Sequence, residues 1–272
     1  MKSAVAILSF TSLAAAWCNY GTALHPRHAN LARRAAGEFG YDELEGPLNW
    51  HGLDAANSAC ASGTNQSPIN VHPGTTPTAG GSSINFTADN APAGAEFENL
   101  GHGVQAYATG SINVGGTAYA LQQFHFHTPS EHRIGSEYYP GEVHFVFQAP
   151  DNSISVVGIP LEVAGSGDAT SPLITAVLGS VGQIPTTGDV TTTGALDFSE
   201  IAEHVASTQL YQYSGSLTTP PCDEEVAWNL VSQPLFIDVA TFREVKSIVK
   251  FNSRYTQNNP GQVNLLVNAR SH

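Results

Sequence analysis

Apolar residues in this chain occur in short runs, where they alternate with polar residues or follow one another for a few positions. Gly, Pro and Asn residues, which favour turns, separate these runs. Side chains of a strand alternate between the two faces of a sheet, so runs of this length predict β-strands. The predicted strands cover residues 83–86, 105–108, 121–127, 143–148, 155–163 and 226–231.

Two segments have a helical pattern instead. Ser171 and Pro172 predict a helix start, with the helix continuing to Val181. Asp238 predicts the N-cap of a second helix, whose inward face would carry Val239, Phe242, Val245 and Ile248. Both helices are expected to lie outside the site described below. No repeat, linker or abrupt change in charge divides the chain after about residue 39, so one continuous, mainly β domain is predicted.

Composition supports an ordered protein. Of the 272 residues 41 % are hydrophobic, which is enough to fill a sizeable core, and only 12 % are charged. The 26 glycines, together with frequent Thr, Ser, Val and Asn, favour short strands and turns over long charged helices.

The N-terminus predicts a protein made for export. Residues 1–16 have the pattern of a signal peptide, with a basic Lys2, an apolar stretch and small residues at Ala14 and Ala16. The stretch is too short to span a bilayer, and no later run is long enough. Residues 17–34 end in Arg33-Arg34 and are interpreted as a pro-peptide, which leaves residues 35–272 as the mature domain. We therefore expect a secreted protein of the extracellular or cell-wall space.

The charge of the chain excludes some classes of partner. Removal of residues 1–34 takes away four basic residues and no acidic one, so the formal net charge of −13 becomes −17. A strongly acidic domain is a poor ligand for nucleic acid or for an anionic membrane, and neither is expected as a partner.

Two cysteines remain after this trimming, Cys60 and Cys222. In an exported chain such a pair favours one disulfide, and a catalytic cysteine is the alternative. Asn85-Phe-Thr87 and Asn65-Gln-Ser67 fit the glycosylation acceptor pattern. Asn85 is the better candidate, because Pro68 directly follows the second motif.

Two predicted strands carry histidines that can meet. In Leu121-Gln-Gln-Phe-His-Phe-His127 strand alternation places Gln123, His125 and His127 on one face and the aromatic residues on the other. Glu142-Val-His144-Phe-Val146 repeats the arrangement, and a neighbouring antiparallel strand would bring His144 to the first two histidines. Three neutral imidazoles can bind zinc and leave a fourth position open. A packed or solvent-exposed histidine pair is the alternative.

Several motifs occur together in one order: Gln123-Phe-His-Phe-His127, Ser130-Glu-His132, Glu142-Val-His144 and Gly215-Ser-Leu-Thr-Thr-Pro-Pro-Cys222. Others are Gly46-Pro-Leu-Asn-Trp50 and Asn65-Gln-Ser-Pro-Ile69 upstream, and Ala227-Trp228 and Asn252-Ser-Arg254 downstream. In these motifs the chain resembles the α-carbonic anhydrases over roughly residues 39–270. The resemblance implies a single α+β domain built on a large, twisted, mostly antiparallel central sheet with a few short peripheral helices.

The resemblance also implies a function. Zinc-bound hydroxide would hydrate carbon dioxide reversibly to bicarbonate and a proton, with hydrolysis of activated esters as a side activity. A non-catalytic binding module of the same fold is one alternative. A different zinc hydrolase is another, although the chain has no His-Glu-x-x-His motif.

The residue roles that the resemblance implies fall into four groups. The zinc ligands would be His125, His127 and His144, supported by Gln123 and Glu142, while Thr218 and Glu131 would orient the hydroxide.

The substrate pocket would be lined by Val146, Val156, Leu217, Thr219 and Trp228. A proton would leave through the shuttle His102 along water held by Tyr41 and Gln105, although Leu100 stands where the family commonly has Asn. Cys60 and Cys222 match the disulfide of exported members, and His51, His132 and His204 are interpreted as surface or structural residues.

Overall fold

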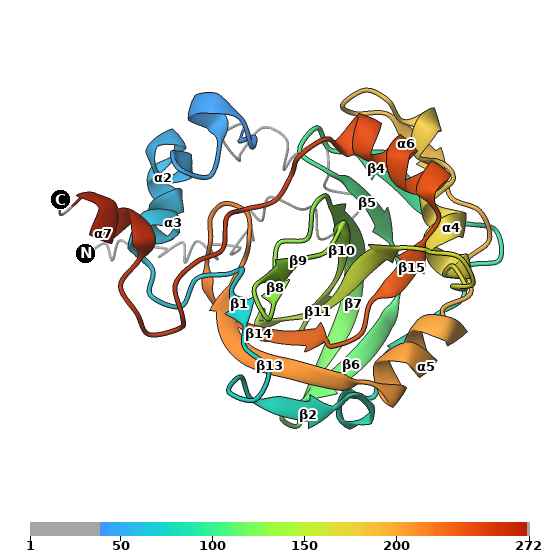
Figure 1. The fold of residues 1–272 in the computed structure, drawn as a ribbon, viewed down its shortest axis with the longest axis horizontal. Coiled ribbons are helices and arrows are strands. Elements are labelled where there is room, and N and C mark those ends of the chain that lie inside the picture. Colours follow the sequence, from blue (N-terminus) through green and yellow to red (C-terminus); the bar gives the residue numbers. More distant parts are fainter. Residues whose placement is uncertain (1–38, 271–272) are drawn as a thin grey trace, which may run out of the picture.

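A large twisted sheet forms the body of the molecule (Figure 1). The computed structural model describes residues 39–270, so the expected signal peptide and the expected pro-peptide lie outside the described residues. The main path of the 12-stranded sheet runs β12 (Val190–Thr192), β4 (Glu96–Asn99), β5 (Val104–Tyr107), β7 (Thr117–His127), β10 (Gly141–Gln148), β11 (Ile154–Val163), β14 (Glu224–Val231), β13 (Gln209–Ser216) and β2 (Thr78–Gly80). Off this path lie β15 (Leu235–Ile237), β6 (Gly110–Val114) and β3 (Thr87–Ala88).

The sheet is mixed but mostly antiparallel, which confirms the predicted fold class. Within the described residues its parallel pairs are those of β11 with β14 and with β15. A second sheet of three short strands contains β1 (Asn70–Val71), β8 (Arg133–Ile134) and β9 (Glu137–Tyr138).

The helices are short and lie around the sheet. They are α2 (Trp50–Leu53), α3 (Ala59–Ser62), α4 (Pro172–Leu178), α5 (Ser199–Ser207), α6 (Val239–Val249) and α7 (Leu265–Arg270). Single 3-10 turns occur at η2 (Glu43–Glu45), η3 (Ala55–Ser58), η4 (Gly81–Ile84) and η5 (Val181–Gln183). Among residues 39–270 we find no helix with both the length and the apolar character that crossing a membrane requires.

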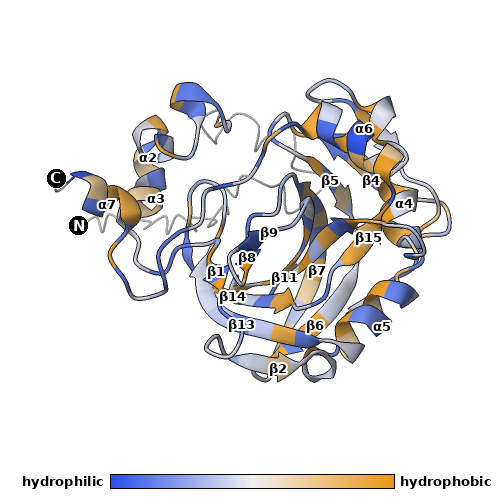
Figure 2. Cartoon of the chain, in the orientation of Figure 1, coloured by the Kyte–Doolittle hydropathy of each residue, from blue (hydrophilic) through white to orange (hydrophobic). Residues whose placement is uncertain are grey.

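The main core lies on one face of the large sheet. Phe124, Phe126 and Phe145 from the central strands pack there in one buried cluster with Ile174 of α4 and Val205 of α5. Figure 2 shows hydrophobic residues on α4, one of the helices that pack on this face. Because α4, α5 and α6 cover this face, the opposite face of the central strands is left for a functional site.

The two predicted helices begin where expected. The Ser171 hydroxyl accepts from the backbone N–H of Ile174, and the Asp238 carboxylate accepts from those of Ala240 and Thr241. The first helix ends at Leu178, before a separate turn over Val181–Gln183, and is therefore shorter than predicted.

Val239 was wrongly expected to face inward, since 42 % of it is exposed. Residues spaced three apart point in directions that differ by about 60° around the helix axis. In a run with only such spacings, the first residue therefore lies beside the buried face and not within it.

A strand at residues 83–86 was predicted wrongly. Ser83 and Ile84 are the last two residues of the turn η4. Asn85, directly after it, has a left-handed conformation with φ 45°. The turn lies against α5, because a Cβ on Gly81 would stand 1.6 Å from the carbonyl oxygen of Val205. This contact with a distant segment, not the local alternation, sets the backbone there.

Cys60 and Cys222 form the predicted disulfide. Both are fully buried and pack with Phe39 and Trp50 in a small cluster away from the main core. The guanidinium of Arg254 donates to the carbonyl oxygens of Ser67 and Cys60, at 2.7 and 3.1 Å. The disulfide thus joins α3 to the loop that carries Thr218.

We expect the double substitution Cys60→Ser and Cys222→Ser to lower the free energy of unfolding by about 2–5 kcal/mol, because the bond closes a long loop in the unfolded chain. The cysteines are 162 residues apart. Urea denaturation of the variant and of the oxidised parent protein measures the difference. A reduced parent that is as stable as the oxidised one would contradict the expectation.

Candidate metal centre

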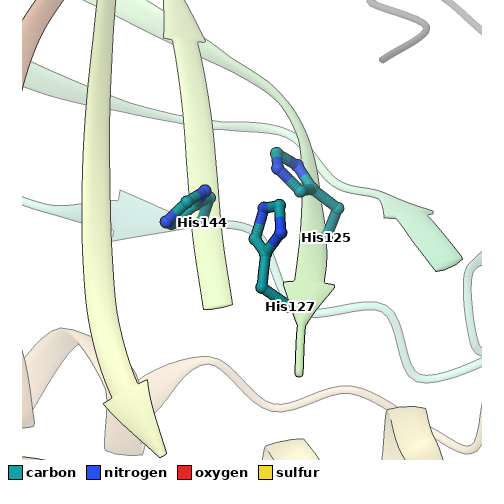
Figure 3. Close-up of side chains that lie close together, drawn as sticks. All are labelled: His125, His127 and His144. Atoms are coloured by element: carbon teal, nitrogen blue, oxygen red, sulfur yellow. The ribbon is translucent and has the colours of Figure 1, made fainter. Parts of the chain in front are cut away.

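Three histidines meet on the sheet face opposite the main core. Strands β7 and β10 are antiparallel, with His144 directly opposite His125 and Glu142 opposite His127. The neighbouring Phe124 and Phe126 point into the main core, as strand alternation predicts. Figure 3 shows the three imidazoles turned toward one another from the two strands.

The histidines form a compact buried cluster. Each offers a ring nitrogen that lies within 4.8 Å of those of the other two. The ring centroids are 5.0 Å apart for His125 and His127, and 4.6 Å apart for His127 and His144.

The outward ring nitrogens all contact acceptors. His125 Nδ1 lies 2.9 Å from Gln123 Oε1, and His127 Nδ1 lies 2.8 Å from the carbonyl oxygen of Asn252. His144 Nε2 lies 2.8 Å from Glu142 Oε1. Because these nitrogens must donate, the other three, His125 Nε2, His127 Nε2 and His144 Nδ1, carry lone pairs.

This arrangement fits a zinc ion. His127 Nε2 is buried without a hydrogen-bond partner in the described residues, which is costly unless a ligand uses its lone pair. Zinc accepts three neutral imidazoles and leaves a fourth position open, and outer acceptors of this kind orient metal-binding histidines. The residues present therefore suit a zinc centre.

Burial keeps the three imidazoles neutral. It lowers the pKa of His127 to about 4 and that of His125 well below its ordinary value. The pKa of His144 is also lowered by burial, although the neighbouring Glu142 carboxylate opposes this. Neutral imidazole is the form that binds a metal, so the site is ready for a cation at neutral pH.

Glu142 supports the cluster from behind. Burial alone would raise the pKa of its carboxyl, but His132 and His144 hold that pKa well below the ordinary value. Its Oε2 accepts the backbone N–H groups of Glu131 and His132 at 2.9 and 2.8 Å, while Oε1 contacts His132 Nδ1 at 2.7 Å.

Two residues of this support, His132 and Asn252, had only structural or surface interpretations from the sequence, and a third, Tyr213, was not singled out. Asn252, His132 and Tyr213 contact the three histidines or their partners, and Tyr213 Oη lies 2.6 Å from His132 Nε2. His132 and Asn252 stand in motifs that carry the resemblance, which was the available signal. His204 and His51 were also interpreted as structural or surface residues. His204 contacts the carbonyl oxygen of Gln233, and His51 contacts the side chain of Arg270.

Glu131 lies beside the histidine cluster and is completely buried. Its Oε1 accepts the backbone N–H of Arg254 at 2.8 Å, and its Oε2 is 3.5 Å from His127 Nε2. Burial raises the pKa of Glu131 to about 7, against the opposing effects of His144, the Arg254 N–H and the Thr218 side chain. The Thr218 side chain is thus near enough to affect Glu131, although Glu131 Oε2 has no hydrogen-bond partner among the described residues.

An apolar wall adjoins the histidines. Four of the five predicted pocket residues belong to one buried cluster, which contains Val146, Val156, Leu217 and Trp228 with Ile154 and Val226. The Trp228 ring centroid is 4.9 Å from that of His144. Thr219, the fifth predicted residue, is buried next to Thr218 in the same loop.

The residues predicted for proton transfer lie near the cluster. Gln105 is buried and pairs directly with His125 across β5 and β7. His102 stacks on Phe39 with 4.4 Å between ring centroids, and burial lowers its pKa to about 4. Tyr41 packs edge-on against Phe39 and Trp50, and burial and the Glu131 carboxylate raise its pKa.

Comparison with known proteins agrees with this geometry. Residues 45–271 match the family model of eukaryotic-type carbonic anhydrase. A carbonic anhydrase of Neisseria gonorrhoeae is 32 % identical over 224 residues, which cover 81 % of each chain. One of Pectobacterium atrosepticum is 30 % identical over 220 residues, 78 % of this chain and 83 % of that protein.

A solved structure is also similar. The fungal α-carbonic anhydrase from Aspergillus oryzae is 47 % identical, with a TM-score of 0.83 over 86 % of this chain and 98 % of that one. The fold, the histidine cluster and the extent of these matches lead to one conclusion: the chain belongs to the α-carbonic anhydrase family and is a carbonate dehydratase.

Proposed function

We propose that this protein hydrates carbon dioxide reversibly to bicarbonate and a proton, with Zn²⁺ held by His125, His127 and His144. The observation that carries the proposal is the hydrogen bonding of the three imidazoles, which commits one nitrogen of each to an outer acceptor and leaves three lone pairs facing inward. The ion, when bound, lowers the pKa of water and supplies a nucleophile near neutral pH, as is established for carbonic anhydrases.

Thr218 and Glu131 orient the nucleophile. The Thr218 hydroxyl, which is near enough to lower the pKa of Glu131, would donate its proton to that carboxylate, so its oxygen could then only accept a hydrogen bond. A nucleophile that donates to Thr218 directs its lone pair at the substrate. A bound cation nearby favours the ionised carboxylate that this direction requires.

The apolar wall binds the substrate. Val146 and Val156 lie directly opposite each other on β10 and β11, and Val156 pairs with Trp228 on β14. With Leu217 and Thr219 they offer an uncharged surface next to the histidines, which suits carbon dioxide. Charged bicarbonate gains little from such a wall and leaves.

A proton leaves through His102. Its side chain is half-buried, and Tyr41 and Gln105 would supply polar groups along the path. Burial lowers the pKa of His102 to about 4, so the neutral imidazole is the resting form and can accept a proton, but this pKa lies below the neutral range in which a shuttle works best.

We expect His102→Ala to keep zinc and to lower kcat on the order of tenfold in dilute buffer, because proton release loses its carrier. Small imidazole buffers are expected to restore the rate. Stopped-flow hydration at low and high buffer concentration measures both effects. An unchanged kcat in dilute buffer would show that His102 is not the shuttle.

The main test of the proposed function is a hydration assay on purified protein with measured zinc content. The activity should disappear with a chelator and return with Zn²⁺, and the same preparation should hydrolyse an activated ester slowly. Protein that is inactive at full zinc occupancy would refute the proposal.

We also propose export and glycosylation. Asn85 is exposed, whereas Asn65 Oδ1 accepts the backbone N–H of Gly261 and Ser67 is fully buried. Secreted protein should therefore carry a glycan that Asn85→Gln removes and Asn65→Gln does not, as read by mass spectrometry with and without a glycosidase. N-terminal sequencing of the same material tests cleavage after residues 16 and 34.

A further inference from the structure

A buried carboxylate and phenol contact each other on strands next to the metal ligands. Tyr107 Oη donates to Glu98 Oε1 at 2.5 Å, from β5 to the neighbouring β4. The two residues are only 9 % and 8 % exposed. An O–H donor this close to a carboxyl oxygen is typical of an ionised acceptor, so the contact is a strong, charge-assisted hydrogen bond.

The sheet register places this pair on the face that carries the histidines. Glu98 pairs with Gln105, Gln105 pairs with His125, and His125 pairs with His144. Directly paired residues of antiparallel strands point to the same face, so these four side chains form one row. Two strand spacings, about 10 Å, separate the backbones of Glu98 and His125.

Tyr107 connects Glu98 with Gln105. Two residues apart on β5, Gln105 and Tyr107 share a face and a side-chain hydrogen bond. Tyr107 stays protonated, because burial and the Glu98 carboxylate raise its pKa far above the ordinary value, and Glu96 adds a smaller effect of the same sign.

The ionised carboxylate fixes the direction of the whole chain of contacts. A carboxylate only accepts, so the Tyr107 hydroxyl spends its single proton on Glu98. The phenol oxygen can then only accept from Gln105, which must present its NH₂ group to Tyr107. The Gln105 Oε1 is therefore turned away from Tyr107. The opposing effects of the two contacts on the Tyr107 pKa, raised by Glu98 and lowered by Gln105, agree with these directions.

We propose that Glu98 is a positioning residue which, through Tyr107, fixes the Gln105 amide so that its oxygen is presented as an acceptor to the proton path beside His125. The inference rests on the proposed function, in which Gln105 lines that path. An amide free to turn would at times present its NH₂ group in place of the oxygen and so disturb the order of the water chain along this path.

Kinetics provide the first test. In dilute buffer, Glu98→Gln and Tyr107→Phe should each lower kcat on the order of tenfold, while kcat/KM for carbon dioxide stays within about twofold. Concentrated imidazole buffer should restore kcat. Glu203→Gln, an exposed residue of α5, and Tyr119→Phe, an equally buried tyrosine in the main core, are matched controls and should leave both constants unchanged. An unchanged kcat, or an equal fall in kcat/KM, would overturn the proposal.

The second test needs neither metal nor activity. The side-chain NH₂ signals of Gln105 in the ¹⁵N-labelled, zinc-free protein are identified by their loss in Gln105→Leu. They should shift in Tyr107→Phe and in Glu98→Gln but not in the two controls. Unshifted signals would overturn the proposed contact. If the parent protein with zinc were inactive while these signals shifted, the proposed function would fail and the contact would stand.

Discussion

Replacing His144 by alanine is expected to abolish zinc binding and carbon dioxide hydration together. His144 is buried and its Nδ1 is one of the three inward nitrogens, since Glu142 engages Nε2. Loss of an outer partner costs 10- to 100-fold in metal affinity, so loss of a ligand should weaken zinc binding by more than about 100-fold. Zinc content after dialysis, together with stopped-flow hydration, measures the two losses.

A matched substitution separates this effect from general damage. His204→Ala removes a half-buried histidine that contacts the carbonyl oxygen of Gln233, outside the site, and should leave zinc content and rate unchanged. Gln123→Ala should lie between the two, because it removes only the acceptor of His125. If folded His144→Ala protein kept stoichiometric zinc, the assignment of the ligand set would be wrong.

Local sequence patterns were sufficient where one strand decides the structure. Alternation along β7 placed Phe124 and Phe126 in the core and His125 and His127 on the other face, because a strand has a period of two residues. The same holds for β10, and the antiparallel pairing that brings His144 to His125 was anticipated.

Prediction failed where a distant segment decides the structure. Residues 83–86 alternate like a strand, but the approach of Gly81 to α5 turns the backbone there. The helix α5 and the strand β13 were not predicted, although Ile201, Val205 and Leu210 are fully buried in the main core. Ile201 and Val205 are four residues apart, so a helical signal for α5 was present and was missed. In β13, polar residues interrupt the alternation, and the pairing with β14 fixes the strand.

The support of the metal centre has the same limit. The carbonyl oxygen of Asn252 contacts His127 from 125 residues away, and a backbone group leaves no mark in side-chain chemistry. Tyr213 contacts His132 across 81 residues. Such partners follow from the tertiary fold, so the sequence indicated them only through motifs that resemble a known family.

Replacing Thr218 by alanine should lower kcat/KM by about 10²- to 10³-fold, the usual cost of removing one preorganised hydrogen-bonding group that acts in the transition state. Thr218 supplies no ring nitrogen to the cluster, so zinc content should be unchanged. Thr218→Ser keeps the hydroxyl and should retain most of the activity. Thr192→Ala, in the exposed edge strand β12, serves as the control.

Glu131→Gln tests whether the direction of the hydrogen bond matters as well as its presence. The amide has the size of the carboxylate but can donate a hydrogen bond to the Thr218 oxygen. The threonine proton is then free to donate to the nucleophile, which reverses the direction of that hydrogen bond. The loss in kcat/KM should therefore approach that of Thr218→Ala, and the double variant should lose little more than either single one, because both act on one interaction. Losses that multiply in the double variant would mean that Thr218 and Glu131 act separately, and the orientation proposed for the nucleophile would then be wrong.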